Sequence, residues 1–201
     1  MCAQDFSGGK ERLREIISRY WTTPERAEWA LKTNVIPLSE LREWMKDDEI
    51  EILGFAGAMI HDGRFRIEPP LPLQEYVGFE KTYYERCLRE SPDGEWSDSR
   101  YTAGYDLVNV FAGLWRNPEV PRPILDELKS WLGRLYKAGD EEMRTCIVHA
   151  TLEHLVEQKP IREFFSDWSR DTVLKVAYEE ACLWPDGGGR TPLGKPPGSG
   201  R

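Results

Sequence analysis

Apolar side chains recur every three or four positions along most of this chain, which is the spacing of amphipathic helices. Residues 10–21 show the pattern, and residues 124–138 repeat it with four leucines on one side. Pro24 is typical of a first helical turn, and Gly139 is typical of a helix end. Consecutive segments are joined by short turns, as antiparallel neighbours are. The sequence therefore predicts an all-α fold of about nine helices in stacked antiparallel pairs, as a helical-repeat-like or irregular bundle.

The segment from Asp140 to Pro160 predicts the most deeply packed helix. Asp140 is placed to cap the first free amides, and Pro160 prevents continuation. At about 100° per residue the apolar side chains fall on two sides, so we expect this helix to be packed on both and to act as a central strut. The two apolar sets are Met143, Cys146, Ile147 and Ala150, and Val148, Leu152, Leu155 and Val156.

Three stretches depart from the helical pattern and define the domain organisation. Residues 1–9 predict a flexible leader, and residues 185–201 predict a disordered Gly- and Pro-rich tail. Residues 64–72 contain three prolines, which favour an extended, polyproline-like crossover over a central strand. We expect a single all-helical domain over residues 10–184, with a division near 64–72 into N-terminal and C-terminal helical halves as the alternative.

Composition narrows the class of partner. The net charge is −8, of which the tail contributes +2, so the rest of the chain carries −10. Such a field repels phosphate backbones and attracts basic proteins, and the would-be recognition helix of a helix-turn-helix, residues 39–51, is acidic. No stretch approaches the roughly 20 apolar residues of a membrane span. We therefore expect a basic protein partner, and neither nucleic acid nor a membrane.

The cysteines and the N-terminus bear on location. The four cysteines are scattered, no CxxC pair occurs, and three of them lie among apolar neighbours in helical patterns. The first residues lack the apolar run of a signal peptide. Both observations favour reduced thiols and a cytoplasmic protein.

The sharpest candidate for chemistry is the cluster His149, Glu153 and His154. A zinc-protease helix places two histidines four residues apart on one face, but these are five apart, about 140° around the helix. We therefore expect no metal site and no cofactor, and a hydrogen-bonded core position for His154. No hydrolase, nucleotide-loop or Cys–His motif occurs, so we assign no catalytic residue and favour a non-enzymatic role.

A polar strip on the otherwise apolar helix 100–116 provides the alternative site. Asp106 and Asn109 lie on this strip, and charged groups so placed are usually paired. The other interpretation is a pocket of an enzyme or small-ligand protein, which Asp106 and Asn109 would form with His149 and Glu153.

An acidic run between two predicted helices is the strongest candidate for a contact surface. It consists of Asp47, Asp48, Glu49 and Glu51. Charge of this kind chiefly speeds encounter with a basic partner, although a solvated helix junction would have the same composition. Trp29 and Trp44 lie near the run in the sequence, where they are either aromatic anchors of an interface or core residues.

Residues 94–184 also resemble a known kind of protein. The spacings concerned are Arg100-Tyr101, Gly104-Tyr105-Asp106-Leu107-Val108-Asn109, Leu114-Trp115, Leu132, Leu135-Tyr136, Thr151-Leu152-Glu153-His154-Leu155 and Phe164-Phe165. With them the chain resembles uncharacterised bacterial all-helical proteins, some of which look like the immunity or antitoxin-type proteins of bacterial conflict systems. The resemblance implies an acidic helical scaffold that binds another protein and has no catalytic residues.

Together these observations predict a non-enzymatic, acidic protein-binding module, an immunity or antitoxin-like inhibitor that blocks a basic bacterial toxin. Two alternatives stay open: the enzyme or small-ligand protein described above, and a scaffold subunit of a larger complex tethered by the tail. Convergence of the four pocket residues would favour the first alternative. Loss of association on removal of residues 185–201 would favour the second.

Overall fold

The computed structural model describes residues 7–20 and 34–183 and confirms the all-α class. It contains two compact units, residues 1–103 and 104–201. The prolines at 69, 70 and 72 lie inside the first unit, in the connection that leads into its last long helix. The single domain predicted over 10–184, and its alternative division near 64–72, stay predictions.

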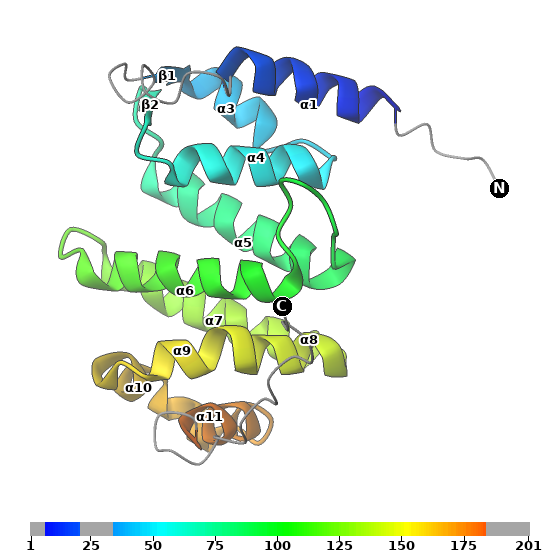
Figure 1. The fold of residues 1–201 in the computed structure, drawn as a ribbon. Helices are drawn as coiled ribbons and strands as arrows, with labels where there is room; N and C mark the ends of the chain where they lie inside the picture. The colour runs from blue at the N-terminus through cyan, green and yellow to red at the C-terminus, as the bar shows by residue number, and fades with distance from the viewer. Residues whose placement is uncertain (1–6, 21–33, 184–201) are drawn as a thin grey trace, which may run out of the picture. The chain divides into compact units, whose positions relative to one another are not determined.

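The first unit is built from helices packed in sequence order (Figure 1). Its elements are α1 (Ser7–Tyr20), β1 (Asn34–Pro37), α3 (Leu38–Trp44), α4 (Ile50–His61), β2 (Phe65–Glu68) and α5 (Leu73–Glu90). α4 lies between α3 and α5, because its apolar residues are buried almost all round the helix. The core of this unit includes Leu41, Trp44, Phe55 and Leu88, all at most 2% exposed.

The first unit contains a short parallel strand pair that the sequence pattern does not predict. β1 pairs with β2 in the register Ile36 to Ile67, and Ile36 is fully buried. The sequence predicts an extended crossover over residues 64–72, and the structure pairs the start of this segment with residues 34–37. Each strand has only four residues, and two helices separate them in the chain, so no hairpin spacing signals the pairing.

Ion pairs and buried aliphatic side chains join α1 to α3 and to the turn that follows it. Leu13 and Ile16 are buried, and Arg12 Nη1 lies 2.6 Å from Asp47 Oδ2. At the other end of α1, Arg19 and the hydroxyl of Tyr20 both contact the carboxylate of Glu40. α1 therefore occupies a defined place against α3 and supplies one wall of the site described below.

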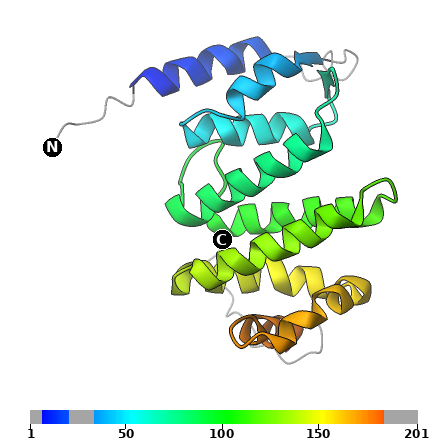
Figure 2. The same ribbon diagram turned by 180° about the vertical axis from the view of Figure 1, so that it is seen from behind.

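The second unit is entirely helical within the residues described. It comprises α6 (Arg100–Arg116, which begins in the first unit), α7 (Arg122–Ala138), α8 (Glu141–Cys146), η1 (Ile147–Leu152), α9 (Glu153–Val156), α10 (Lys159–Phe165), η2 (Ser166–Arg170) and α11 (Leu174–Leu183). α7 is partly hidden behind α6 in Figure 1 and lies in front of it in Figure 2, so the two helices occupy different layers.

The central strut predicted over 140–160 is present, but it is not one regular α-helix. Asp140 caps it through the Met143 amide at 2.9 Å, and both predicted apolar sets are buried, as expected. Residues 147–152 form π-helical turns, in which the hydrogen bonds span five residues instead of four. Ala150 packs there against Gly104 of α6, where any larger side chain would collide with it. Pro160 lies in the first turn of α10 instead of ending the strut.

Three predicted features lie wholly or partly outside the described residues. They are the leader 1–9, the helix expected to begin at Pro24, which would contain Trp29, and the tail 185–201. Residues 7–9 of the leader belong to α1. The prediction for the tail stays a prediction.

Candidate protein-binding hollow

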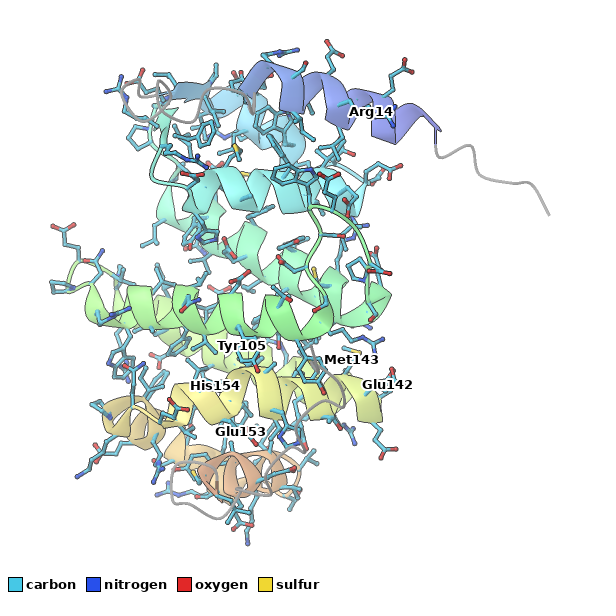
Figure 3. The ribbon with its side chains drawn as sticks, viewed as in Figure 1. Arg14, Tyr105, Glu142, Met143, Glu153 and His154 are labelled. Carbon is cyan, nitrogen blue, oxygen red and sulfur yellow. The ribbon has the colours of Figure 1, made fainter. Side chains whose placement is uncertain are left out.

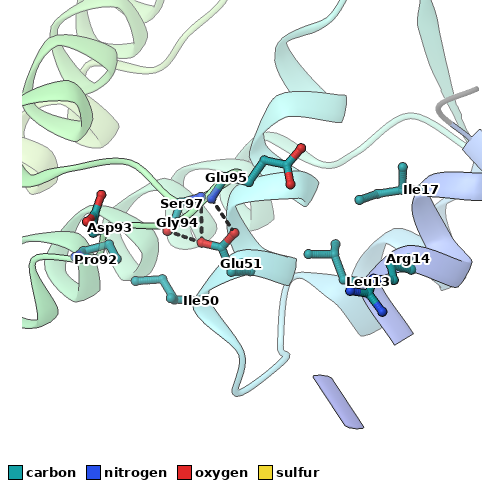
Figure 4. Close-up of a pocket in the computed structure, with 10 residues that line it drawn as sticks. All are labelled: Leu13, Arg14, Ile17, Ile50, Glu51, Pro92, Asp93, Gly94, Glu95 and Ser97. Carbon is teal, nitrogen blue, oxygen red and sulfur yellow. Dashed lines mark hydrogen bonds between the residues drawn. The ribbon is translucent and has the colours of Figure 1, made fainter. Parts of the chain in front are cut away.

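A hollow of about 530 Å³ in the first unit is a candidate binding site (Figure 4). We call it the α1–α4 hollow, because α1, the start of α4 and the loop between α5 and α6 form its walls. Its lining residues are Leu13, Arg14, Ile17, Ile50, Glu51, Pro92, Asp93, Gly94, Glu95 and Ser97. The volume is that of an ordinary ligand pocket, which holds several side chains.

Glu51 fixes the loop wall of this hollow. Its carboxylate accepts the amides of residues 95, 96 and 97, each at 3.0 Å, and the hydroxyl of Ser97. Gly94 lies so close to this carboxylate that a Cβ atom there would collide with it. Burial raises the pKa of Glu51, but the hydrogen bonds from Ser97 and the amides outweigh burial and lower the pKa overall. The loop is therefore held by a half-buried, ionised carboxylate.

The floor and the rim of the hollow differ in chemistry. The floor is apolar and consists of Leu13, Ile17 and Ile50. Leu13 is 8% exposed, and the two isoleucines are half-buried. Asp93 and Glu95 stand exposed on the loop side and form no salt bridge within the described residues. Arg14 is exposed on the α1 side, as Figures 3 and 4 show. The hollow thus combines an apolar centre with an acidic edge.

The acidic run predicted from the sequence is divided by the fold. Asp47 is paired with Arg12, and its carboxylate also accepts the Glu49 amide, so only 8% of its side chain is exposed. Glu51 is occupied by the loop. Only Asp48 and Glu49 keep exposed side chains, directly before the two α4 residues that line the hollow.

Trp44 is a core residue, which removes it from the predicted contact surface. It is 2% exposed, and its ring lies edge-on to those of Phe55 at 5.7 Å and Tyr20 at 5.3 Å. The other tryptophan of that prediction, Trp29, lies outside the described residues. Of the two interpretations of Trp44, an interface anchor or a core residue, its burial therefore supports the second.

The alternative pocket brings together only two of its four predicted residues. His149 Nδ1 lies 2.6 Å from Glu153 Oε1, and Glu180 of α11 approaches the other ring nitrogen at 3.4 Å. Asp106 and Asn109 are exposed on α6. Gly104 of α6 faces the helix that carries His149. Around the axis of α6, Asp106 lies about 200° and Asn109 about 140° from Gly104, so both side chains point away from His149.

The two histidines of the strut contact different neighbours, as their spacing predicts. His154 packs against Tyr105 with ring centroids 5.0 Å apart, and its Nδ1 lies 3.3 Å from Glu157. Figure 3 shows Tyr105 and His154 together on the α6 side of the strut, whereas Glu153 lies on the side of α11. His154 is half-buried instead of being enclosed in the core as expected.

A second hollow, of about 390 Å³, lies next to His149 but does not include it. Glu180 lines both this hollow and the surroundings of His149. Arg144 also lines this hollow. Its guanidinium donates to the carbonyls of Tyr136 and Lys137 and so caps the C-terminal end of α7. The guanidinium of Arg144 is thus engaged within the fold.

A histidine–carboxylate pair that sequence reasoning missed joins α4 to α5. His61 Nε2 lies 2.9 Å from Oε1 of Glu80, which is 6% exposed. Nearby, the Tyr83 hydroxyl donates to Asp98 at 2.8 Å and accepts from its amide at 2.9 Å. Burial raises the pKa of Asp98, although the bond from Tyr83 opposes the shift. No local spacing reveals these contacts, because the partners are 15 and 19 residues apart.

Two further kinds of site are absent from the described part of the chain. Among residues 7–20 and 34–183, no three or more His, Cys, Asp or Glu side chains are grouped so that they could hold a metal ion. No helix in those same ranges has both the length and the apolar character needed to cross a bilayer. Comparison with protein-family models, with curated proteins and with solved structures finds no match to this chain.

Proposed function

We propose that this chain is a non-enzymatic, acidic protein-binding module that binds a basic protein and blocks it, in the manner of an immunity or antitoxin protein. The observation that carries the proposal is the α1–α4 hollow, whose apolar floor lies beside the exposed carboxylates of Asp93 and Glu95. Protein-binding surfaces commonly combine an apolar centre with a polar rim.

The distribution of charge supports the same role. Residues 1–103 contain 20 acidic and 14 basic side chains, whereas residues 104–201 contain 15 and 13. The unit that contains the hollow therefore carries a net charge of −6, whereas residues 104–184, without the basic tail, carry −4. An excess of one sign steers an oppositely charged partner toward the surface and raises its association rate.

Capture and protection assays test the proposal together. The immobilised full chain is exposed to lysate of its own host, and bound proteins are identified at low and at high salt. We expect one basic protein to bind at low salt with fixed stoichiometry. When that protein is produced alone it should inhibit growth or show an activity, and co-production of this chain should suppress the effect. Capture of no basic protein, or a captured protein whose effect is unchanged, would contradict the proposal.

A further inference from the structure

We propose that the α1–α4 hollow recognises a segment of the partner in which an apolar side chain lies next to a lysine or arginine. The apolar side chain enters the hollow, and the basic group pairs with Asp93 and Glu95. The inference rests on the proposed function and adds to it the place and the chemistry of recognition.

The floor selects the apolar part of the segment. Leu13, Ile17 and Ile50 face one space from two separate helices, and all three offer only carbon atoms. Filling this space removes apolar surface of both partners from water, which favours association. A segment with only charged side chains would leave the apolar floor in contact with water, so we expect it to bind more weakly.

The rim selects the basic part. Asp93 and Glu95 are two residues apart on the loop that Glu51 holds, and the Glu95 amide itself donates to Glu51. The bound loop presents both carboxylates before the partner arrives, so less conformational freedom is lost on binding. Glu51 is thus a positioning residue, because its own carboxylate is occupied by the loop.

Arg14 gives the site a direction. It lies on the α1 wall, across the apolar floor from the loop, and forms no salt bridge within the described ranges. A basic group of the partner is repelled on that side and attracted on the loop side. Conversion of Arg14 to an acid should therefore strengthen binding. A general effect of net charge would instead give the same gain when an arginine elsewhere on the chain is converted.

A labelled helical peptide of about 18 residues, with leucine on one face and lysine on the other, is a suitable probe. Its affinity for the full chain is measured by fluorescence anisotropy. Asp93→Lys with Glu95→Lys should weaken binding about tenfold or more, whereas Glu119→Lys with Glu141→Lys in the second unit, with the same net charge, should change it less than about threefold. Ile17→Gln should weaken binding, and Val176→Gln, exposed on α11, should not. Arg14→Glu should strengthen binding more than Arg134→Glu does.

Three results would overturn the inference. The first is that Asp93→Lys with Glu95→Lys weakens binding no more than Glu119→Lys with Glu141→Lys does. The second is that a lysine-only peptide binds as tightly as the leucine–lysine peptide. The third is that the leucine–lysine peptide does not bind. In each case, capture and neutralisation of a basic protein by the wild-type chain would still uphold the proposed function, with the contact elsewhere. Failure of capture with a positive peptide result would remove the proposed function and leave the hollow as a peptide-binding site. Thermal unfolding of each variant verifies that it is folded.

Discussion

Each unit contains a carboxylate that accepts several backbone amides, and the two differ in how far along the chain they reach. Asp171 accepts the amides of Val173 and Leu174, both at 3.0 Å, at the start of α11. Glu51 accepts the amides of residues 95–97, which lie 44 to 46 positions away. The chemistry is the same, but Asp171 caps its own helix, whereas Glu51 joins two distant parts of the first unit.

This difference explains which carboxylates sequence reasoning assigns well. An N-cap is recognised by its position before a helical pattern, and the cap predicted at Asp140 is present. Asp171 occupies the same kind of position before α11. Glu51 belongs to an acidic run, and the composition of that run indicates an exposed contact surface. Only the fold shows that the Glu51 carboxylate is occupied by the loop amides.

Glu51→Ala should produce the largest loss of stability. Removal of the carboxylate leaves three amides and the Ser97 hydroxyl without their acceptor, and hydrogen bonds to charged groups contribute about 1.5–3 kcal/mol each. Because water reaches part of the loop after the change, we expect a net loss of about 3 kcal/mol in the free energy of unfolding. Urea denaturation measures this loss. Glu49→Ala, an exposed neighbour, should stay within about 0.5 kcal/mol of wild type, and a similar small effect of Glu51→Ala would refute its role.

Gly94→Ala should have the next largest effect. The added methyl group would meet the Glu51 carboxylate and the Ser97 hydroxyl, so either the loop or the carboxylate must move. Forced repacking of this kind costs about 1–3 kcal/mol. Gly113, in the exposed interior of α6, is the matched control, because nothing lies near its Cβ position and alanine favours helix. The expected order of urea midpoints is Gly113→Ala above wild type and Gly94→Ala below it; the reverse would contradict the close packing.

Asp171 should make the stability of the protein depend on pH in the acid range. The Lys137 ammonium and the two amides lower its pKa from the ordinary 3.8 to about 2. A carboxylate whose pKa falls on folding stabilises the fold above its ordinary pKa, and this stabilisation is lost as the pH decreases from 3.8 to about 2. In thermal unfolding from pH 2 to 7, Asp171→Asn should flatten the acid side of the profile. Asp126→Asn should leave it unchanged, and identical profiles for the wild type and Asp171→Asn would refute the assignment.

Ser91→Gly should produce the smallest effect, a gain. Ser91 ends α5 in the left-handed region at φ 46°, where glycine is favoured, and it begins the loop that Glu51 holds. We expect the free energy of unfolding to rise by up to about 1 kcal/mol. Ser130→Gly, in the interior of α7, should lower it by about the same amount, because there glycine weakens a helix. A loss at both positions would show that the left-handed cap is not the native conformation.

The same division between local and distant contacts decides how much of the fold and site was predictable. Periodicity locates most helices and the buried faces of the strut, since both depend on neighbours along the chain. It does not reveal the β1–β2 pair, the π-helical turns beside Gly104, or the pair of His61 and Glu80, because each depends on an element distant in sequence. The hollow was missed for the same reason, and its nearest signal in the sequence was the pair of acidic residues at positions 93 and 95.

The most direct test of the central claim is a methyl NMR titration of the full chain with the leucine–lysine peptide. The account predicts that the methyl signals of Ile17 and Ile50 shift on binding and follow the affinity measured by anisotropy. It also predicts that Asp93→Lys with Glu95→Lys abolishes those shifts at the same peptide concentration. Shifts confined to exposed methyl groups of the second unit, such as those of Val176 and Leu183 on α11, would contradict it.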